Sequence, residues 1–166
     1  MTVQTAPTDR PGQGQNPSET VDAATVARQR WMSVLARTPR ITLETQWSAQ
    51  YGDENWTHLR EPQIGMVMVR GRAGGAGQRF NLGEMTVTRC AVTLSDGTVG
   101  HSYVKGRDRV QAQYAALFDA IMLRDGSASN FIDDLAETQA NAKRDHARKV
   151  AATKVDFFTL VRGEDE

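Results

Sequence analysis

The chain has 166 residues, a length that fits one domain with a buried core. Its 20 basic and 20 acidic residues balance, so no overall charge attracts nucleic acid or an anionic membrane, and no apolar run is long enough to cross a bilayer. One cysteine excludes an internal disulfide and no apolar secretion signal opens the chain, so we expect a cytoplasmic protein with neither nucleic acid nor membrane as a partner.

The N-terminal segment, residues 1–19, carries three of the five prolines and almost no apolar side chains. Burial cannot offset the entropy that is lost when such a segment becomes ordered. We therefore predict a disordered tail over residues 1–19 and a single domain over residues 20–166.

Two short helices are predicted next. The first is capped by Ser18 or Thr20 and runs to about Arg37, and the second starts after Thr38-Pro39 and ends near Tyr51. A helix-turn-helix unit that binds DNA fits this pattern. Ordinary packing of two helices is the commoner structure, so we favour a helical hairpin.

The central part of the chain predicts a small sheet. An irregular linker closes at Pro62. β-Branched residues then predict three strands, at Ile64–Arg70, Glu84–Leu94 and Thr98–Lys105. Gly71–Gly77 forms a glycine-rich tip between the first two, and Asp96-Gly97 favours a hairpin turn between the last two. Because apolar residues fall on both faces of these strands, we expect both faces of the sheet to be covered.

Two C-terminal helices complete the predicted fold. Asp108 caps one that runs to about Arg124, and the other covers about Asn130 to Lys154. An apolar segment follows, which either folds back as a strand or core segment or docks on another chain. Its interface candidates are Phe157, Phe158, Leu160 and Val161. The expected fold class is α+β: an N-terminal helical hairpin, a central, mostly antiparallel sheet of three or more strands, two C-terminal helices and an apolar C-terminal segment.

The glycine-rich tip GRAGGAG invites a phosphate-binding interpretation. Its spacing matches neither the dinucleotide nor the P-loop pattern, and no helix begins directly after it, so we favour a flexible tip or a close backbone approach at an interface. Arginines are dense in this part of the sequence: Arg70, Arg72, Arg79, Arg89, Arg107 and Arg109. They can hold phosphate or phosphonate oxygens, or form ion pairs with acids of this chain such as Glu84, Asp96 and Asp108 or with those of a partner. For any single arginine we favour the ion pair.

Other polar residues have a structural and a chemical interpretation each. Cys90 is expected to be a buried, inert residue, and a catalytic thiol with His101 as its base is the alternative. His101 itself is interpreted as a core residue, and His58 as part of the linker. Asn81 to Glu84 predict a compact turn, with a substrate contact as the alternative. No Ser-His-Asp arrangement, metal cluster or carboxylate pair can be assembled, so a self-sufficient enzyme is disfavoured and no metal site is assigned.

Four ordered motifs carry a family resemblance. They are RWMSVLA in the first helix, LREPQIGMVMVRGRAGGAGQRFNLGEMTVTRCAVTLSDGTVGHSYVKGRD across the sheet, AALFDA, and VDFFTLVRGE near the C-terminus. In these motifs the chain resembles the PhnG family, the G subunit of the bacterial carbon–phosphorus lyase system, over about Arg30 to Glu164.

The resemblance implies an accessory, structural subunit of a core complex with the H, I and J subunits, containing more than one copy of this chain. The complex replaces adenine at ribose C1 of its co-substrate ATP with a phosphonate such as methylphosphonate, and the I subunit is the catalytic component. A later carbon–phosphorus cleavage uses an iron–sulfur cluster and S-adenosylmethionine on the J subunit. One cysteine cannot hold such a cluster, so no cofactor is expected in this chain.

The resemblance transfers no catalytic residue. The candidates for contacting substrate, or for completing a neighbour's site, are Arg70, Arg72, Asn81, Glu84, Arg89 and His101. The alternative function is a stand-alone phosphate- or nucleotide-binding enzyme that uses the glycine-rich tip and the arginines.

Overall fold

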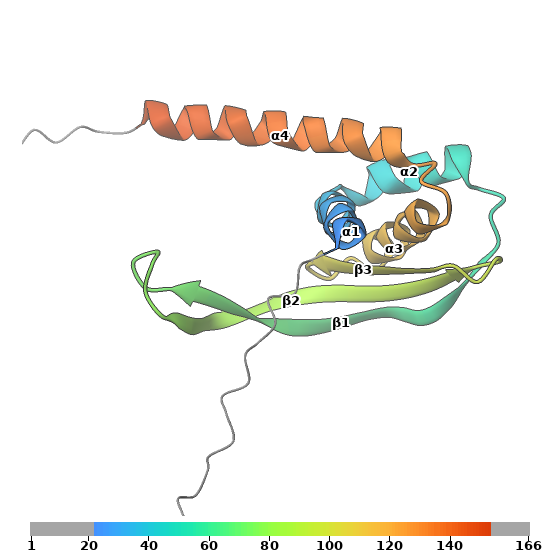
Figure 1. Ribbon diagram of the computed structural model, residues 1–166, viewed down its shortest axis with the longest axis horizontal. Helices are drawn as coiled ribbons and strands as arrows, with labels where there is room; N and C mark the ends of the chain where they lie inside the picture. Colours follow the sequence, from blue (N-terminus) through green and yellow to red (C-terminus); the bar gives the residue numbers. More distant parts are fainter. Residues whose placement is uncertain (1–21, 154–166) are drawn as a thin grey trace, which may run out of the picture.

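The computed structural model describes residues 22–153, and the fold in this range is α+β. Its elements are α1 (Ala23–Leu35), α2 (Arg40–Gln50), β1 (Trp56–Arg72), β2 (Arg79–Leu94), β3 (Val99–Lys105), α3 (Arg109–Arg124) and α4 (Ser129–Ala152). The strands form one antiparallel sheet in the order β1-β2-β3, and the helices lie on one side of it (Figure 1). The predicted fold class is confirmed. No helix between residues 22 and 153 is long and apolar enough to cross a membrane.

The core lies between α3 and the sheet. α3 packs directly on β2 and β3, α1 and α2 pack on α3, and α4 packs on α1. Gly100 of β3 makes the helix–sheet approach close, because a Cβ there would clash with the backbone oxygen of Ala116 and lie 2.6 Å from the nitrogen of Ala120. The largest fully buried apolar side chains come from the helices and strands alike: Leu35, Leu43, Val92, Val104, Leu117, Phe118 and Ile121.

The predicted helical hairpin is confirmed, and its turn is tied into the body. Thr38, between α1 and α2, is fully buried and donates its hydroxyl to the Val34 oxygen at 2.9 Å. Gln111 of α3 donates to the Thr38 carbonyl at 2.7 Å, and Gln139 of α4 donates to its hydroxyl at 3.2 Å. One threonine therefore links all four helices.

Helix boundaries agree with the sequence at most ends. Asp108 caps α3 as predicted, because its side chain accepts the Gln111 amide at 2.9 Å. The predicted cap at Ser18 or Thr20 is wrong, since α1 begins at Ala23 after Asp22. The predicted tail, residues 1–19, and the interface candidates Phe157, Phe158, Leu160 and Val161 lie outside the described residues.

The first two strands are longer than the sequence indicates. β1 starts at Trp56 and runs through Pro62, so the predicted linker is wrong, and His58 lies in a strand with its ring edge-on to Trp56, 4.9 Å between centroids. The pairing of β1 with β2 shifts register between residues 58 and 63, and β1 is an edge strand. Proline is tolerated in such a place because it breaks no continuous ladder.

β2 also begins earlier than expected, at Arg79, so the predicted compact turn at Asn81 to Glu84 is wrong. The turn lies instead between Arg72 and Arg79, where Gly74 and Gly75 have positive φ angles of 58° and 79°. Leu82 is an extra residue opposite the Val69–Arg70 step of β1. Such a bulge accommodates the irregular sequence that resembles a turn.

Within residues 22–153 the helices cover only one face of the sheet, so the prediction of two covered faces is wrong for this part of the chain. Cys90, Val92 and Ser102 face α3, whereas Arg89, His101 and Tyr103 lie on the uncovered face. The prediction failed because apolar residues also lie on the uncovered face. Ala91 is buried there although no helix covers it, because it lies between Arg60 and His101 of the neighbouring strands.

Two parts of the molecule project beyond this body. β3 pairs with β2 only from Val87 onward, so residues 66–86 form a two-stranded extension that we call the arm. The second half of α4 extends in the same direction on the helix-covered side of the sheet (Figure 1). Both projections are rich in exposed residues.

Candidate functional site

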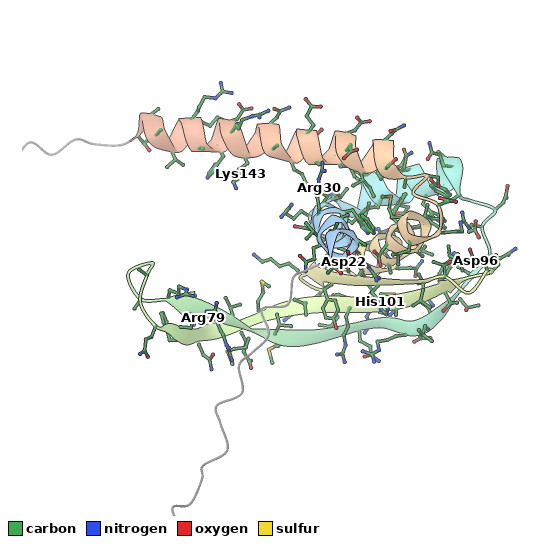
Figure 2. All side chains as sticks on the ribbon, viewed as in Figure 1. Asp22, Arg30, Arg79, Asp96, His101 and Lys143 are labelled. Carbon is green, nitrogen blue, oxygen red and sulfur yellow. The ribbon has the colours of Figure 1, made fainter. Side chains whose placement is uncertain are left out.

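The six predicted site residues do not form one pocket. Four of them lie on the arm: Arg70, Arg72, Asn81 and Glu84. The other two, Arg89 and His101, lie on the body of the sheet. Figure 2 shows the separation through Arg79 at the end of the arm and His101 on the body. Asn81 and Ala91, the cross-strand neighbour of His101, are ten residues apart on β2, about 33 Å in extended chain.

The body cluster lies in a hollow on the uncovered face of the sheet. Its polar lining comes from Arg60, Arg89, His101 and Tyr103, and Ala91 contributes to the floor. Arg89 donates to the neutral amide oxygen of Gln63 at 3.3 Å. Among the residues that the structure describes, no acidic side chain lines this hollow. Two guanidinium groups beside a phenol and an imidazole suit an anionic group, because charge-assisted donors bind phosphate and carboxylate oxygens most strongly.

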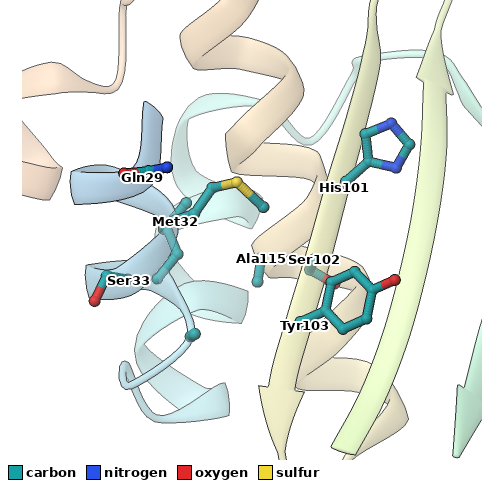
Figure 3. Close-up of a pocket in the computed structure, with 9 residues that line it drawn as sticks. Gln29, Met32, Ser33, His101, Ser102, Tyr103 and Ala115 are labelled. Atoms are coloured by element: carbon teal, nitrogen blue, oxygen red, sulfur yellow. The ribbon is translucent and has the colours of Figure 1, made fainter. Parts of the chain in front are cut away.

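His101 is exposed rather than a core residue, so that prediction is wrong. A second hollow lies between β3 and α1, and there Met32 faces the strand while the rings of His101 and Tyr103 lie on its far side (Figure 3). The two aromatic side chains thus belong to the uncovered face, at the edge of the sheet.

The backbone of His101 is fixed by a buried carboxylate that the sequence did not reveal. Asp119 of α3 is fully buried and accepts the His101 amide at 2.8 Å. It also accepts two bonds from Arg28 of α1, the shorter 2.7 Å, and one from the indole of Trp31 at 2.8 Å. The one sequence signal for Asp119 is its place as an acid inside the apolar run AALFDAIM, since a buried charge requires hydrogen-bond donors around it.

The arm cluster lies on the face of the sheet that the helices cover farther along. β1 alternates regularly here, so Met66, Met68, Arg70 and Arg72 share this face. Cross-strand pairing adds Glu84, Asn81 and Arg79. Arg79 was in the predicted basic set but not among the site candidates. The structure thus brings four candidates to one surface, with a third arginine beside them.

The arginines of the sheet differ from those of the helices in whether they form ion pairs with carboxylates. Carboxylates pair with Arg28, Arg30, Arg40, Arg124 and Arg148, all on helices. Within residues 22–153, no carboxylate pairs with Arg60, Arg70, Arg72, Arg79 or Arg89. For the sheet arginines, the favoured ion pairs with Glu84, Asp96 or Asp108 are therefore wrong in this range, and pairing with a partner's acids stays a prediction. The strands hold six basic and two acidic residues, so the sheet is cationic in a neutral protein.

Cys90 is confirmed as a buried residue and is not a nucleophile. Burial raises the pKa of its thiol from 9.0 to about 11, against a smaller lowering by the backbone at Ala91. Its Sγ lies 3.5 Å from the Arg60 carbonyl, on the face opposite His101. A neutral thiol that faces away from the imidazole cannot use it as a base, which rules out the alternative of a catalytic pair.

The glycine-rich tip has no phosphate-loop geometry. A strand, β2, follows it rather than a helix, so no helix N-terminus points at a bound anion. In the part of the chain that the structure describes, no group of three or more His, Cys, Asp or Glu side chains could hold a metal ion.

Comparison with known proteins agrees with the motifs. The model of the family described as "Phosphonate metabolism protein PhnG" matches residues 26–163. The chain is also 42% identical over 147 residues to the alpha-D-ribose 1-methylphosphonate 5-triphosphate synthase subunit PhnG of Rhizobium meliloti (strain 1021), covering 87% of this chain and 94% of the relative. With most of both sequences aligned, the chain belongs to the PhnG family of phosphonate metabolism proteins.

Proposed function

We propose that this chain is an accessory subunit of a complex that transfers a phosphonate, such as methylphosphonate, to ribose C1 of ATP and releases adenine. The observation that carries the proposal is the similarity over 94% of the length of a relative named as a subunit of the corresponding synthase. The described part of the chain supports a dependent role, since its candidate residues are split between two open surfaces and Cys90 is inert.

The partners in this proposal are the H, I and J subunits, in a cytoplasmic assembly with more than one copy of this chain. The I subunit performs the exchange at ribose C1, and the J subunit carries the iron–sulfur cluster and uses S-adenosylmethionine in the later cleavage. This chain then supplies surfaces rather than a cofactor.

The cationic hollow at Arg60, Arg89, His101 and Tyr103 is the surface that suits the reaction. Both co-substrates, the phosphonate and the triphosphate of ATP, are anions, and the hollow offers charged donors with no acid to compete among its described lining residues. The anchored backbone of His101 holds this surface in place, since Asp119 binds it from the core. The hollow is open, so a neighbouring subunit would have to exclude water from it.

Co-purification tests the assembly. A tagged chain is expressed with the H, I and J subunits and purified at low salt, and we expect all four to elute as one species. Recovery of the tagged chain alone and folded would refute the proposal. A reaction with ATP and methylphosphonate then tests the role: adenine release, followed by chromatography, should require this chain and fall at least about tenfold in an Arg60→Ala/Arg89→Ala variant that still assembles.

The competing function, a stand-alone phosphate- or nucleotide-binding enzyme using the glycine-rich tip and arginines, is tested by calorimetry of the isolated chain with ATP. Micromolar binding would favour it. We expect no measurable heat, because Arg70 and Arg72 are exposed on a two-stranded arm rather than in an enclosed site.

A further inference from the structure

The arm presents a continuous exposed strip on its helix-side face. Ile64 at its base is 44% exposed, and Met66 and Met68 are 67% and 50% exposed. The same face of β1 continues into Arg70 and Arg72 at the tip. The strip therefore changes from apolar to cationic along its length. Methionine side chains adapt to the shape of a partner, which suits such a surface to protein binding.

The charges on this strip are unfavourable in the isolated chain. Arg72 lies directly opposite Arg79 across the two strands, and like charges in that position repel each other. Glu84 is the one acid on this face, and it forms no ion pair within residues 22–153. A two-stranded hairpin without a cover is also marginally stable in water. An apolar and anionic surface that covers the strip would reduce the charge repulsion and stabilise the hairpin.

Building on the proposed function, we propose that the helix-side face of the arm binds another subunit of the complex through a segment that carries apolar side chains at one end and a cluster of carboxylates at the other. The apolar part of that segment covers Ile64, Met66 and Met68, and its carboxylates pair with Arg70, Arg72 and Arg79. The strip is about 20 Å long from Met66 to Arg72, room for about seven residues of an extended segment. The charge change along the strip sets the direction in which the segment lies.

Matched variants test the charged half. Arg70→Glu/Arg72→Glu is compared with Arg107→Glu/Arg109→Glu, a pair of exposed arginines that precede and open α3 and have no carboxylate partner within the described range. Each full-length chain is titrated against the H, I and J subunits. The arm pair should weaken association at least tenfold, and the control should stay within about threefold. Association of the wild type should weaken with salt, and that of the arm variant should not.

Met66→Ser/Met68→Ser tests the apolar half. Both side chains are at least half exposed, so the variant should keep the wild-type circular dichroism spectrum while association weakens. If the wild-type chain joins no complex, the proposed function fails. If it joins and both arm variants join with unchanged affinity, only the inference about the arm fails.

A photo-crosslinking amino acid in place of Met68 identifies the occupant. We expect a crosslink to another subunit, at a peptide with apolar residues on one side of a cluster of Asp or Glu. A crosslink to a second copy of this chain, or to a peptide without carboxylates, would overturn the inference.

Discussion

Substitution of Asp119 by asparagine probes the buried contact that joins α1, α3 and β3. The change keeps the size of the side chain and removes its charge. One amide oxygen then faces donors from Arg28, Trp31 and His101, and the amide nitrogen can accept none of them. At least one buried donor loses its partner.

The cost follows from the burial of the two charged partners. Removing one member of a buried ion pair costs about 3–5 kcal/mol. Asp119 has no exposed side-chain surface, but Arg28 keeps 32% of its own, so water recovers part of its charge. We therefore expect a loss of about 2–4 kcal/mol in the free energy of unfolding, and a fall in Tm of about 4–16 °C for a chain of this size.

Urea unfolding followed by tryptophan fluorescence measures this loss. The matched control is Asp133→Asn, which breaks the pair of Asp133 with Arg30, where the side chains are 64% and 71% exposed. That control should cost less than about 1 kcal/mol. If Asp119→Asn is no more destabilising than Asp133→Asn, the assignment of Asp119 as the anchor of α1 and β3 is refuted.

Three other outcomes follow from the packing of the sheet. Gly100→Ala should cost about 1–3 kcal/mol in the same urea assay, because the new Cβ would meet the backbone of α3 at Ala116; an unchanged midpoint would contradict this close approach. Cys90 should react with Ellman's reagent at pH 8 only after the chain unfolds, and rapid labelling of the folded protein would contradict its burial. Folding raises the pKa of Cys90 from 9.0 to about 11, so the bound proton stabilises the fold fully below pH 9 and progressively less as the pH rises toward 11. Between pH 8 and 10.5 the free energy of unfolding of the wild type should therefore fall relative to that of Cys90→Ala.

The sequence predicted the elements whose signals are local. The Asp96-Gly97 turn, the Asp108 cap and the apolar spacing of α3 each depend on a few neighbouring residues, and the structure confirms all three. The predicted strands are shorter than β1 and β2 because Pro62 and Leu82 interrupt the alternation expected of strands. The two register irregularities that accommodate them depend on pairing with the other strand, which a linear pattern does not contain.

The candidate site was predicted in composition but not in arrangement. Arg70, Arg72, Asn81 and Glu84 do share one surface, but they do so through cross-strand pairing and a bulge. Arg89 and His101 are separated from them because the arm extends the sheet, and Arg60 joins His101 across β2 from a segment that resembled a linker. Asp119 is the clearest omission, since its three partners come from two elements distant in the chain.

The contact between α1 and Asp119 also constrains the order in which this chain folds. Arg28 and Trp31 precede their acceptor by 91 and 88 residues, whereas β2, β3 and α3 follow one another directly in the sequence. Local contacts form before distant ones, because closing a long loop costs more entropy. During synthesis the first helix therefore emerges well before the residue that holds it, so we expect it to dock on a β2–β3–α3 unit that has already formed. The N-terminal helix is then among the last elements to join the fold.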